Sequence, residues 1–405
     1  MMAQDRAEVF GGVDTHKHTH VAAAVDAAGR LLGTASFEAD AAGYGRLWGW
    51  LRSHGRVVRV GVEGTGSYGA GLARSLTATG AEVVEVGRPN RQMRRRRGKT
   101  DTVDAEAAAR AALSGEAAGE PKSGEGRVEA IRTLGVARRS AVKARTAAAN
   151  QLNAIVVTAP EHLKDRLWTL TTPQLVKTCA RLRPDGGADP ALAAAKTALR
   201  ILARRHQALT TEIVHLDAEL LRLCEQTNPA LLGACGVGVE VASALLVAAG
   251  DNPHRMRSEA SFAALCGTSP IEASSGTTVR HRLNRGGNRY ANSALWRIAM
   301  TRMRVDPRSI TYAQRRKAQG KNQREILRCL KRHIAREIYQ LLTNPPPVPH
   351  GADLRRQRTQ QGLSIEATAR ALNTWSTRIS ELERGLRHNR DLAERYQQHL
   401  TQHAT

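Results

Sequence analysis

Residues 9–39 have the sequence VFGGVDTHKHTHVAAAVDAAGRLLGTASFEA, and this stretch decides the fold of the first part of the chain. It contains three short apolar runs, VFGGVD, HVAAAVD and LLGTASFEA, of which the last two are separated by a turn at Ala28 and Gly29. Runs of this length, bounded by polar and turn residues, predict three β-strands that follow one another in a meander.

The segments after this meander alternate between helical and strand patterns. They predict a helix at 41–54, a strand at 57–62, a helix at 70–79 and a strand at 81–86. Alternation after an opening meander is typical of a mixed sheet flanked by helices. We therefore expect an α/β domain over residues 8–115.

The rest of the chain has helical periodicity and predicts an all-α part. Its expected regions are a coiled-coil-like spacer over 127–228, a third region over 229–342 and a terminal region over 351–400. Two long helices are expected in the spacer, over 128–158 and 190–226. Alanine dominates both, so a helical bundle is an equal alternative to a coiled coil. The segment NPPPVP at 344–349 cannot continue a helix and marks a domain boundary.

The composition points to a nucleic-acid partner. The 405 residues include 61 Lys and Arg against 37 Asp and Glu, which gives a formal net charge of +24. Aromatic residues make up only 3% of the chain, so phosphate contacts by arginine are expected to dominate over base stacking. No apolar run is long enough for a membrane span or a signal peptide, which predicts a cytoplasmic protein. The five scattered cysteines form no disulfide or zinc pattern.

Four carboxylates stand at strand ends and at a helix start of the α/β domain: Asp14, Glu63, Asp101 and Asp104. Each alone has an ordinary structural explanation, as a cap or a helix-start acid. Together they favour a divalent metal site, because Mg²⁺ prefers hard oxygen ligands and relieves the repulsion between converging carboxylates. A basic flank suited to nucleic acid lies beside them and consists of Arg94, Arg95, Arg96, Arg97 and Lys99. The alternating His16, His18 and His20 are expected on one strand face, as surface or substrate-facing residues.

A loop in the third region combines serines with arginines. Ser274 and Ser275 precede Gly276, and Arg280, Arg282, Arg285 and Arg289 follow. A serine attacks phosphorus only if its oxygen is exposed, the phosphate charge is neutralised and another group takes its proton. This loop can supply the first two of these needs. For the serines alone, turn chemistry is the simpler explanation. Between 280 and 340 there are 17 Lys and Arg and only 3 acids, which favours a DNA-binding face. Upstream, LLGACGVGVEVASALL at 231–246 is similar to a helix-hairpin-helix turn that approaches a phosphate.

Several of these motifs occur together in one family. They are GVDTHK at 12–17, VEGTGSYG at 62–69, VVEVGRPNRQMRRRRGKTDTVDAEAAARAAL at 83–113, CGTSPIEASSGTTVRHRLNRGGNRYANSAL at 266–295 and CLKRHIAREIYQLL at 329–342. In this order they resemble the insertion-sequence transposases of the IS-one-ten family, over about residues 8–342. The resemblance implies a RuvC-like (RNase H-fold) DEDD domain followed by a mainly helical, serine-bearing transposase domain.

The resemblance also implies an activity and partners. The DEDD carboxylates fall by motif on Asp14, Glu63, Asp101 and Asp104, with Mg²⁺ as the metal. The nucleophilic serine of the SG motif falls on Ser275, with Ser274 as the neighbouring alternative, and it would form a covalent link to DNA. The implied protein is a DNA recombinase guided by a structured bridge RNA. It would bind double-stranded element ends and target DNA as a dimer or tetramer, with acids and serine from different protomers in one composite centre.

The terminal region departs from that family. Residues 351–400 resemble a Cro/repressor-type helix-turn-helix domain, which typical members lack. Ser364 is expected to cap its second helix, and the recognition helix should open near Trp375 and present Ser376, Thr377 and Arg378 to base edges. A helical oligomerisation tail is the alternative.

Two other functions remain open at this point. One is a RuvC-like nuclease or resolvase in which metal-activated water attacks DNA and Ser275 is only a loop residue. The other is a non-catalytic DNA-binding regulator that uses the basic region and the terminal helices, with the acids serving only structure.

Overall fold

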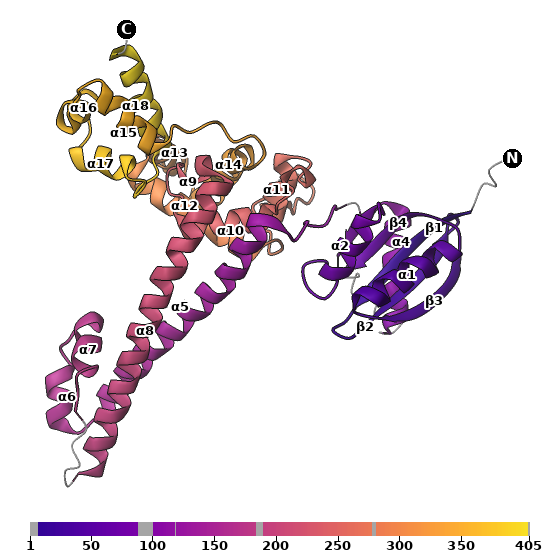
Figure 1. Cartoon of the computed structure of the whole chain (residues 1–405), viewed down its shortest axis with the longest axis horizontal. Coiled ribbons are helices and arrows are strands. Elements are labelled where there is room, and N and C mark those ends of the chain that lie inside the picture. The colour runs from indigo at the N-terminus through magenta and orange to yellow at the C-terminus, as the bar shows by residue number, and fades with distance from the viewer. Residues whose placement is uncertain (1–6, 88–99, 118, 184–188, 278–280, 404–405) are drawn as a thin grey trace. The chain divides into compact units, whose positions relative to one another are not determined.

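The computed structural model describes residues 7–87, 100–117, 119–183, 189–277 and 281–403, and Figure 1 labels most of its elements. The chain divides into two compact units, Met1–Gly126 with Ala249–Arg257 and Arg127–Ala248 with Ser258–Thr405. The first contains a five-stranded sheet with helices, and the described part of the second is helical apart from one short hairpin. The predicted fold class, an α/β part followed by a mostly helical part, is confirmed.

The sheet of the first unit has the strand order β3-β2-β1-β4-β5. Its strands are β1 (Glu8–Thr15), β2 (Thr19–Asp26), β3 (Leu31–Glu38), β4 (Arg56–Glu63) and β5 (Val83–Val86). β2 is antiparallel to both β1 and β3, as the predicted meander requires. β4 and β5 then run parallel to β1, so the carboxyl ends of β1 and β4 lie at one edge of the sheet.

Helices cover the two faces of this sheet. They are α1 (Ala41–Ser53), α2 (Ala70–Ala78) and α4 (Asp101–Ser114). Leu47 and Leu51 of α1 and Leu72 of α2 share a core with alternate residues of β1 and β4. On the opposite face, Ala109 of α4 packs on Phe10 of β1. The two clusters use alternate positions of the same strands because successive side chains of a strand point to opposite faces.

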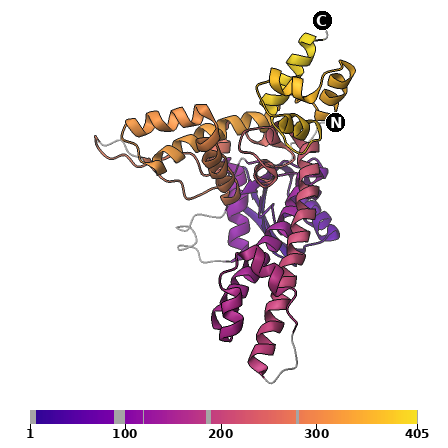
Figure 2. The same cartoon turned by 90° about the vertical axis from the view of Figure 1, so that its left-hand side faces the viewer.

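Two long helices open the second unit, α5 (Gly126–Thr158) and α8 (Pro190–Thr227). They run alongside each other in Figures 1 and 2, and Arg138 of α5 forms an ion pair with Asp217 of α8. The shorter helices α6 (Glu161–Leu167) and α7 (Thr172–Cys179) share a buried core with the far ends of both long helices, so a small bundle forms there. In the described part of the chain, no helix is both long and apolar enough to cross a membrane.

The middle of this unit is a helical cluster with one hairpin. Its elements are α9 (Pro229–Leu232), α10 (Val239–Ala249), α11 (Glu259–Leu265), β6 (Ile271–Glu272), β7 (His281–Arg282), α12 (Arg289–Val305), α13 (Pro307–Ala318) and α14 (Gln323–Thr343). The short helix η1 (Pro253–Arg255) precedes α11 and belongs to the first unit. α14 packs against both α11 and α12, and the apolar side chains Phe262, Ile298 and Ile338 are fully buried.

Four short helices end the chain. They are α15 (Gly351–Gln360), α16 (Ile365–Ala371), α17 (Ser376–Glu383) and α18 (Arg390–His403). Leu354, Ile379 and Tyr396 lie in their common core. Glu383 is also buried there, where it accepts hydrogen bonds from Arg358 Nε at 2.7 Å and from the hydroxyl of Tyr396 at 2.7 Å. The ion pair and the hydroxyl together satisfy a carboxylate that burial would otherwise make unfavourable.

Candidate functional site

The first site residue, Asp14, stands near the end of β1. Alternation along the strand places Val13 in the core under α1 and α2, so Asp14 faces α4 on the other side of the sheet. Its exposed fraction is only 7%. A carboxylate in this position is unusual, because Asp is almost never buried without a partner.

The approach of α4 to the sheet depends on two glycines. Gly12 of β1 and Gly61 of β4 are paired across the two strands. A Cβ at Gly12 would lie 2.0 Å from the backbone nitrogen of Ala109, and one at Gly61 would lie 2.6 Å from the carbonyl oxygen of Ala108. Only residues without a Cβ allow the α4 backbone to lie this close to the strands.

This contact positions the start of α4 beside Asp14. Thr100 caps the helix, since its side chain accepts a hydrogen bond from the backbone of Val103. Asp101 and Asp104 follow in the first turn, Asp101 exposed and Asp104 only 5% exposed. Glu63 ends β4 two residues after Gly61, so it lies on the same face of the sheet and is half-buried.

His16 joins two of these carboxylates. Its Nε2 lies 3.2 Å from Oδ2 of Asp14 and 3.4 Å from Oδ1 of Asp101. Sequence reasoning missed this role and treated His16 as one of three surface or substrate-facing histidines. The available signal was its position two residues after Asp14 at a strand end.

The three histidines do not lie on one strand face, so that expectation is wrong. β1 ends at Thr15 and β2 begins at Thr19, which leaves His16 and His18 in the connecting turn, both exposed. His20 is inside β2, fully buried, and stacks on Tyr44 of α1 with ring centroids 5.6 Å apart. Because α1 and α4 cover opposite faces, His20 points away from the carboxylates.

The electrostatics of the cluster favour a bound cation. Burial raises the pKa of Asp14 above its ordinary value, the charges of Asp101 and Asp104 raise it further, and His16 opposes them. Ligand atoms of Asp14, His16 and Asp101 all lie within 4.8 Å of one another. Glu63 and Asp104 are not part of this group, although the charge of Asp104 acts on Asp14. Two carboxylate oxygens and one imidazole nitrogen form a donor set that suits a divalent cation.

The predicted basic flank cannot be placed. Its five residues lie outside the described residues, and so does Arg280 of the serine loop. The five are Arg94, Arg95, Arg96, Arg97 and Lys99.

The predicted serine lies in the second unit, on the loop between β6 and β7. These strands pair Ile271 with Arg282 and Glu272 with His281, and Ser274 and Ser275 follow β6 as exposed residues. Gly276 has a φ of +57°, a left-handed conformation that favours glycine directly after the serine. The three described arginines predicted to bind nucleic acid are all exposed on or after this loop: Arg282, Arg285 and Arg289.

The base of the serine loop is closed by close backbone contacts and by one buried lysine. A Cβ at Gly287 would lie 2.6 Å from the nitrogen of Gly267. Asn292 Nδ2 donates to the carbonyl oxygens of Cys266 at 2.7 Å and Gly267 at 3.2 Å, and its Oδ1 accepts from Lys331 Nζ at 2.8 Å. Lys331 is 9% exposed, and burial lowers its pKa. Sequence reasoning missed both Asn292 and Lys331.

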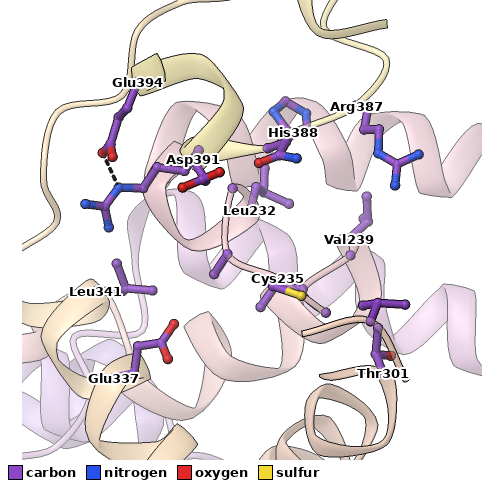
Figure 3. Close-up of a pocket in the computed structure, with 18 of the residues that line it drawn as sticks. Leu232, Cys235, Val239, Thr301, Glu337, Leu341, Arg387, His388, Asp391 and Glu394 are labelled. Atoms are coloured by element: carbon purple, nitrogen blue, oxygen red, sulfur yellow. Dashed lines mark hydrogen bonds and ion pairs between the residues drawn. The ribbon is translucent and has the colours of Figure 1, made fainter. Parts of the chain in front are cut away.

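The segment predicted as a helix-hairpin-helix turn connects α9 to α10. Gly236 adopts a left-handed φ of +84°. Arg302, only 4% exposed, holds the turn by donating from Nε to the carbonyl oxygen of Cys235 at 2.8 Å while its other nitrogens bind Glu337. The turn lines a cavity of about 1050 Å³. Figure 3 shows Cys235 on one side of it, with His388 and Asp391, which precede and begin α18, across from it.

The terminal helices begin where the sequence places them. Ser364 caps α16, because its side chain accepts from the backbone of Ala367 at 3.0 Å. α17 begins directly after Trp375, whose side chain is 78% exposed. Its first turn carries the three residues expected to read base edges: Ser376, Thr377 and Arg378.

Comparison with known proteins gives two family matches. A family model described as a transposase, of the DEDD IS110 type, matches residues 11–159. A second, described as the transposase IS116/IS110/IS902 family, matches residues 229–314. The first match contains all four carboxylates, and the second contains the serine loop and the turn between α9 and α10.

One relative carries a similar description. The "Insertion element IS110 uncharacterized 43.6 kDa protein" of Streptomyces coelicolor is 35% identical over 130 residues, which are 31% of this chain and 32% of that protein. The match thus spans about a third of the relative. The two family models together cover more than half of the chain and describe the same family. The chain therefore belongs to the IS110 (IS-one-ten) family of DEDD transposases.

Proposed function

We propose that this chain is the transposase of a bacterial insertion sequence and that it cuts and rejoins DNA strands with a metal-carboxylate site and a serine nucleophile. The observation that carries the proposal is the cluster of Asp14, His16 and Asp101. It sits at the sheet edge where the α4 backbone lies against two glycines. Carboxylates that lie this close together repel each other and lower the stability of the fold. Such an arrangement therefore favours a functional role over a structural one.

Mg²⁺ fits the carboxylate site as proposed cofactor. Asp14 and Asp101 would hold it, with Glu63 and Asp104 beside them, because carboxylate oxygens are the ligands that this ion prefers. When bound, it supplies neutralisation of phosphate charge and a fixed position for the scissile phosphate. His16 Nε2 is within reach of both proposed ligating carboxylates, so it can orient them. These three side chains and the two neighbouring acids are the proposed catalytic set of the α/β unit, which we take to be RuvC-like over residues 8–115.

Ser275 is the proposed nucleophile. Its Oγ forms a bond to the DNA phosphorus, and the phosphorus–oxygen bond to one deoxyribose breaks. The serine loses one proton in this step, and the released sugar oxygen takes up one proton. The reverse displacement by a sugar hydroxyl rejoins the strand and frees the serine. Ser275 is exposed, and the exposed Arg282 and Arg285 follow it in the same segment; both observations support this role, because an anionic phosphate must be neutralised before attack.

Double-stranded DNA at the element ends and target is the proposed substrate. The exposed arginines of the serine loop and the basic flank Arg94–Lys99 would contact its phosphates. The four terminal helices over 351–400 are the proposed helix-turn-helix domain, in which Ser376, Thr377 and Arg378 at the start of α17 face base edges. The family resemblance extends the proposal to a bridge RNA as guide and to a dimer or tetramer as the active form.

A covalent-adduct assay tests the proposal. Full-length protein is incubated with RNA transcribed from the flanking DNA, Mg²⁺ and labelled element-end DNA, and label retained on denatured protein is measured. Ser274→Ala is the matched control for Ser275→Ala, because both serines are exposed on the same loop. We expect retention in wild type and Ser274→Ala, and loss in Ser275→Ala and Asp14→Ala.

The other outcomes separate the alternatives. Cleavage that needs Asp14 and survives Ser275→Ala without an adduct would leave a metal-dependent nuclease. Specific DNA binding with no cleavage in any variant would leave a non-catalytic regulator.

A further inference from the structure

A second, smaller cavity of about 270 Å³ lies in the helical unit, between α5, α8, α10 and α12. Its floor is apolar, since Leu220, Val241 and Ala294 line it and are at most 6% exposed. This volume is close to the lower end of small-ligand pockets, which is about 300 Å³. The cavity therefore suits one small, largely apolar group. We call it the Tyr290 cavity.

An aromatic ring and a guanidinium form part of its lining. Tyr290, the second residue of α12, is 59% exposed, and the guanidinium carbon of Arg139 lies 4.7 Å from the centre of its ring. The chain has only six tyrosines and few other aromatic residues, so an exposed ring at a cavity is conspicuous. A ring and a guanidinium plane are the surfaces on which unpaired bases stack.

Charged groups complete the rim. Glu240 lies 2.6 Å from Arg297 and 3.6 Å from Arg138, so one carboxylate fixes two arginines at the cavity. Arginines suit the phosphates of a strand, and a carboxylate accepts hydrogen bonds from base amino groups. The rim has more cationic than anionic side chains, which complements a polyanion.

A glycine keeps the cavity open. Gly135 is inside the 33-residue helix α5 and lines the cavity, and a Cβ there would meet only the flexible end of Arg139, at 3.1 Å. Glycine weakens a helix interior, and no close backbone contact requires it at this position. A Cβ at this position would therefore point into the space beside Arg139 without meeting the backbone of another element.

We propose that the Tyr290 cavity takes one unpaired nucleobase of a nucleic-acid strand, with the adjoining phosphates held by its arginines. The inference rests on the proposed function only in taking nucleic acid as the ligand. It adds that the chain distinguishes an unpaired base from a paired one, a property that neither the carboxylate site nor the serine loop provides.

Binding of matched oligonucleotides tests this proposal in the full-length protein. The probes are a labelled 20-nucleotide single-stranded DNA without self-complementarity, the same sequence as RNA, and the same sequence as a DNA duplex, each followed by fluorescence anisotropy at fixed salt. Gly135→Leu adds a side chain at the cavity and favours the helix, and thermal unfolding of the variant separates lost binding from a weakened fold. Ala137→Leu, on the exposed side of the same helix, is the matched control.

We expect Gly135→Leu to weaken single-strand binding about tenfold, in the range for loss of one stacked base, and to leave duplex binding unchanged. Tyr290→Ala should give a similar loss, and Tyr290→Phe and Ala137→Leu should bind like wild type. A larger effect on RNA than on DNA would identify the strand that occupies the cavity.

Unchanged single-strand binding in Gly135→Leu, or an equal loss on the duplex, would overturn the inference. A change in self-association instead of strand binding would overturn it in favour of a protein occupant. These results are independent of the adduct assay. If the protein forms no adduct but Gly135→Leu still binds single strands more weakly than wild type, the proposed chemistry is refuted and the proposal for the cavity stands.

Discussion

Replacing Gly12 by alanine should displace α4 from the sheet and disable the carboxylate site. The new Cβ would lie 2.0 Å from the backbone nitrogen of Ala109, whereas an ordinary contact is at least 3.4 Å. The helix must therefore move by about 1.4 Å, because the three nearest atoms, from Ala105, Ala108 and Ala109, are all backbone atoms that cannot rotate away. Asp101 and Asp104 begin the same helix and would move with it.

The expected size of the effect follows from that displacement. Overpacking of this kind costs about 3 kcal/mol or more in stability, and a misplacement of about 1 Å at a catalytic group can cost about 100-fold in rate. Gly61→Ala should be milder, because its Cβ would lie 2.6 Å from the oxygen of Ala108 and needs a shift of only about 0.8 Å.

Thermal unfolding, calorimetric titration with Mg²⁺ and strand cleavage would measure these effects. Gly49→Ala is the control, because it lies on α1 with open space around it and should stabilise the fold by roughly 0.5–1 kcal/mol. If Gly12→Ala has the same melting temperature, Mg²⁺ affinity and cleavage rate as Gly49→Ala, the account of how α4 is positioned is refuted.

Four further predictions concern single residues. The pKa of Asp14 is raised in the folded state, so the contribution of this carboxyl to stability is present below its ordinary pKa of 3.8 and is lost as the pH rises through the raised value. Asp14→Asn should therefore have a higher melting temperature than wild type at pH 7 without metal. An equal or lower melting temperature would contradict this. His16→Ala should change the Mg²⁺ affinity measured by calorimetry, because it removes a side chain that contacts both proposed ligands, and an unchanged affinity would remove this histidine from the site. Glu383→Gln leaves Arg358 buried without its charge partner and should destabilise the terminal helices by about 3–5 kcal/mol, seen as faster hydrogen exchange in α15–α18, whereas wild-type protection would argue against the buried pair. Lys331→Met removes the donor beneath the serine loop and should lower adduct formation more than DNA binding, and an equal loss of both would mean general unfolding.

Much of the fold could be predicted because its signals are local. The apolar runs of residues 9–39 specify the strands, and Ser364 caps its helix through a hydrogen bond only three residues away. The long helices over 128–158 and 190–226 agree with α5 and α8 within two residues. Each of these features depends on residues close together in the sequence.

The site could be predicted only in part because its contacts are distant. The role of Gly12 depends on its pairing with Gly61, and Lys331 reaches Asn292 across 39 positions. His16 and His20 are four residues apart, yet one lies in a turn and the other is buried against α1. Strand register and helix packing decide these placements, and a single sequence contains neither explicitly.

The central claim is that a metal-carboxylate site and Ser275 act together in strand transfer, and mapping of the covalent product tests it most directly. Wild-type protein that has reacted with element-end DNA and Mg²⁺ is treated with nuclease and trypsin, and the peptide containing both Ser274 and Ser275 is fragmented by mass spectrometry. The account predicts a nucleotide phosphate on Ser275, absent when Asp14 is replaced by alanine. A nucleotide on Ser274, or DNA cleavage without any modified peptide, would contradict it.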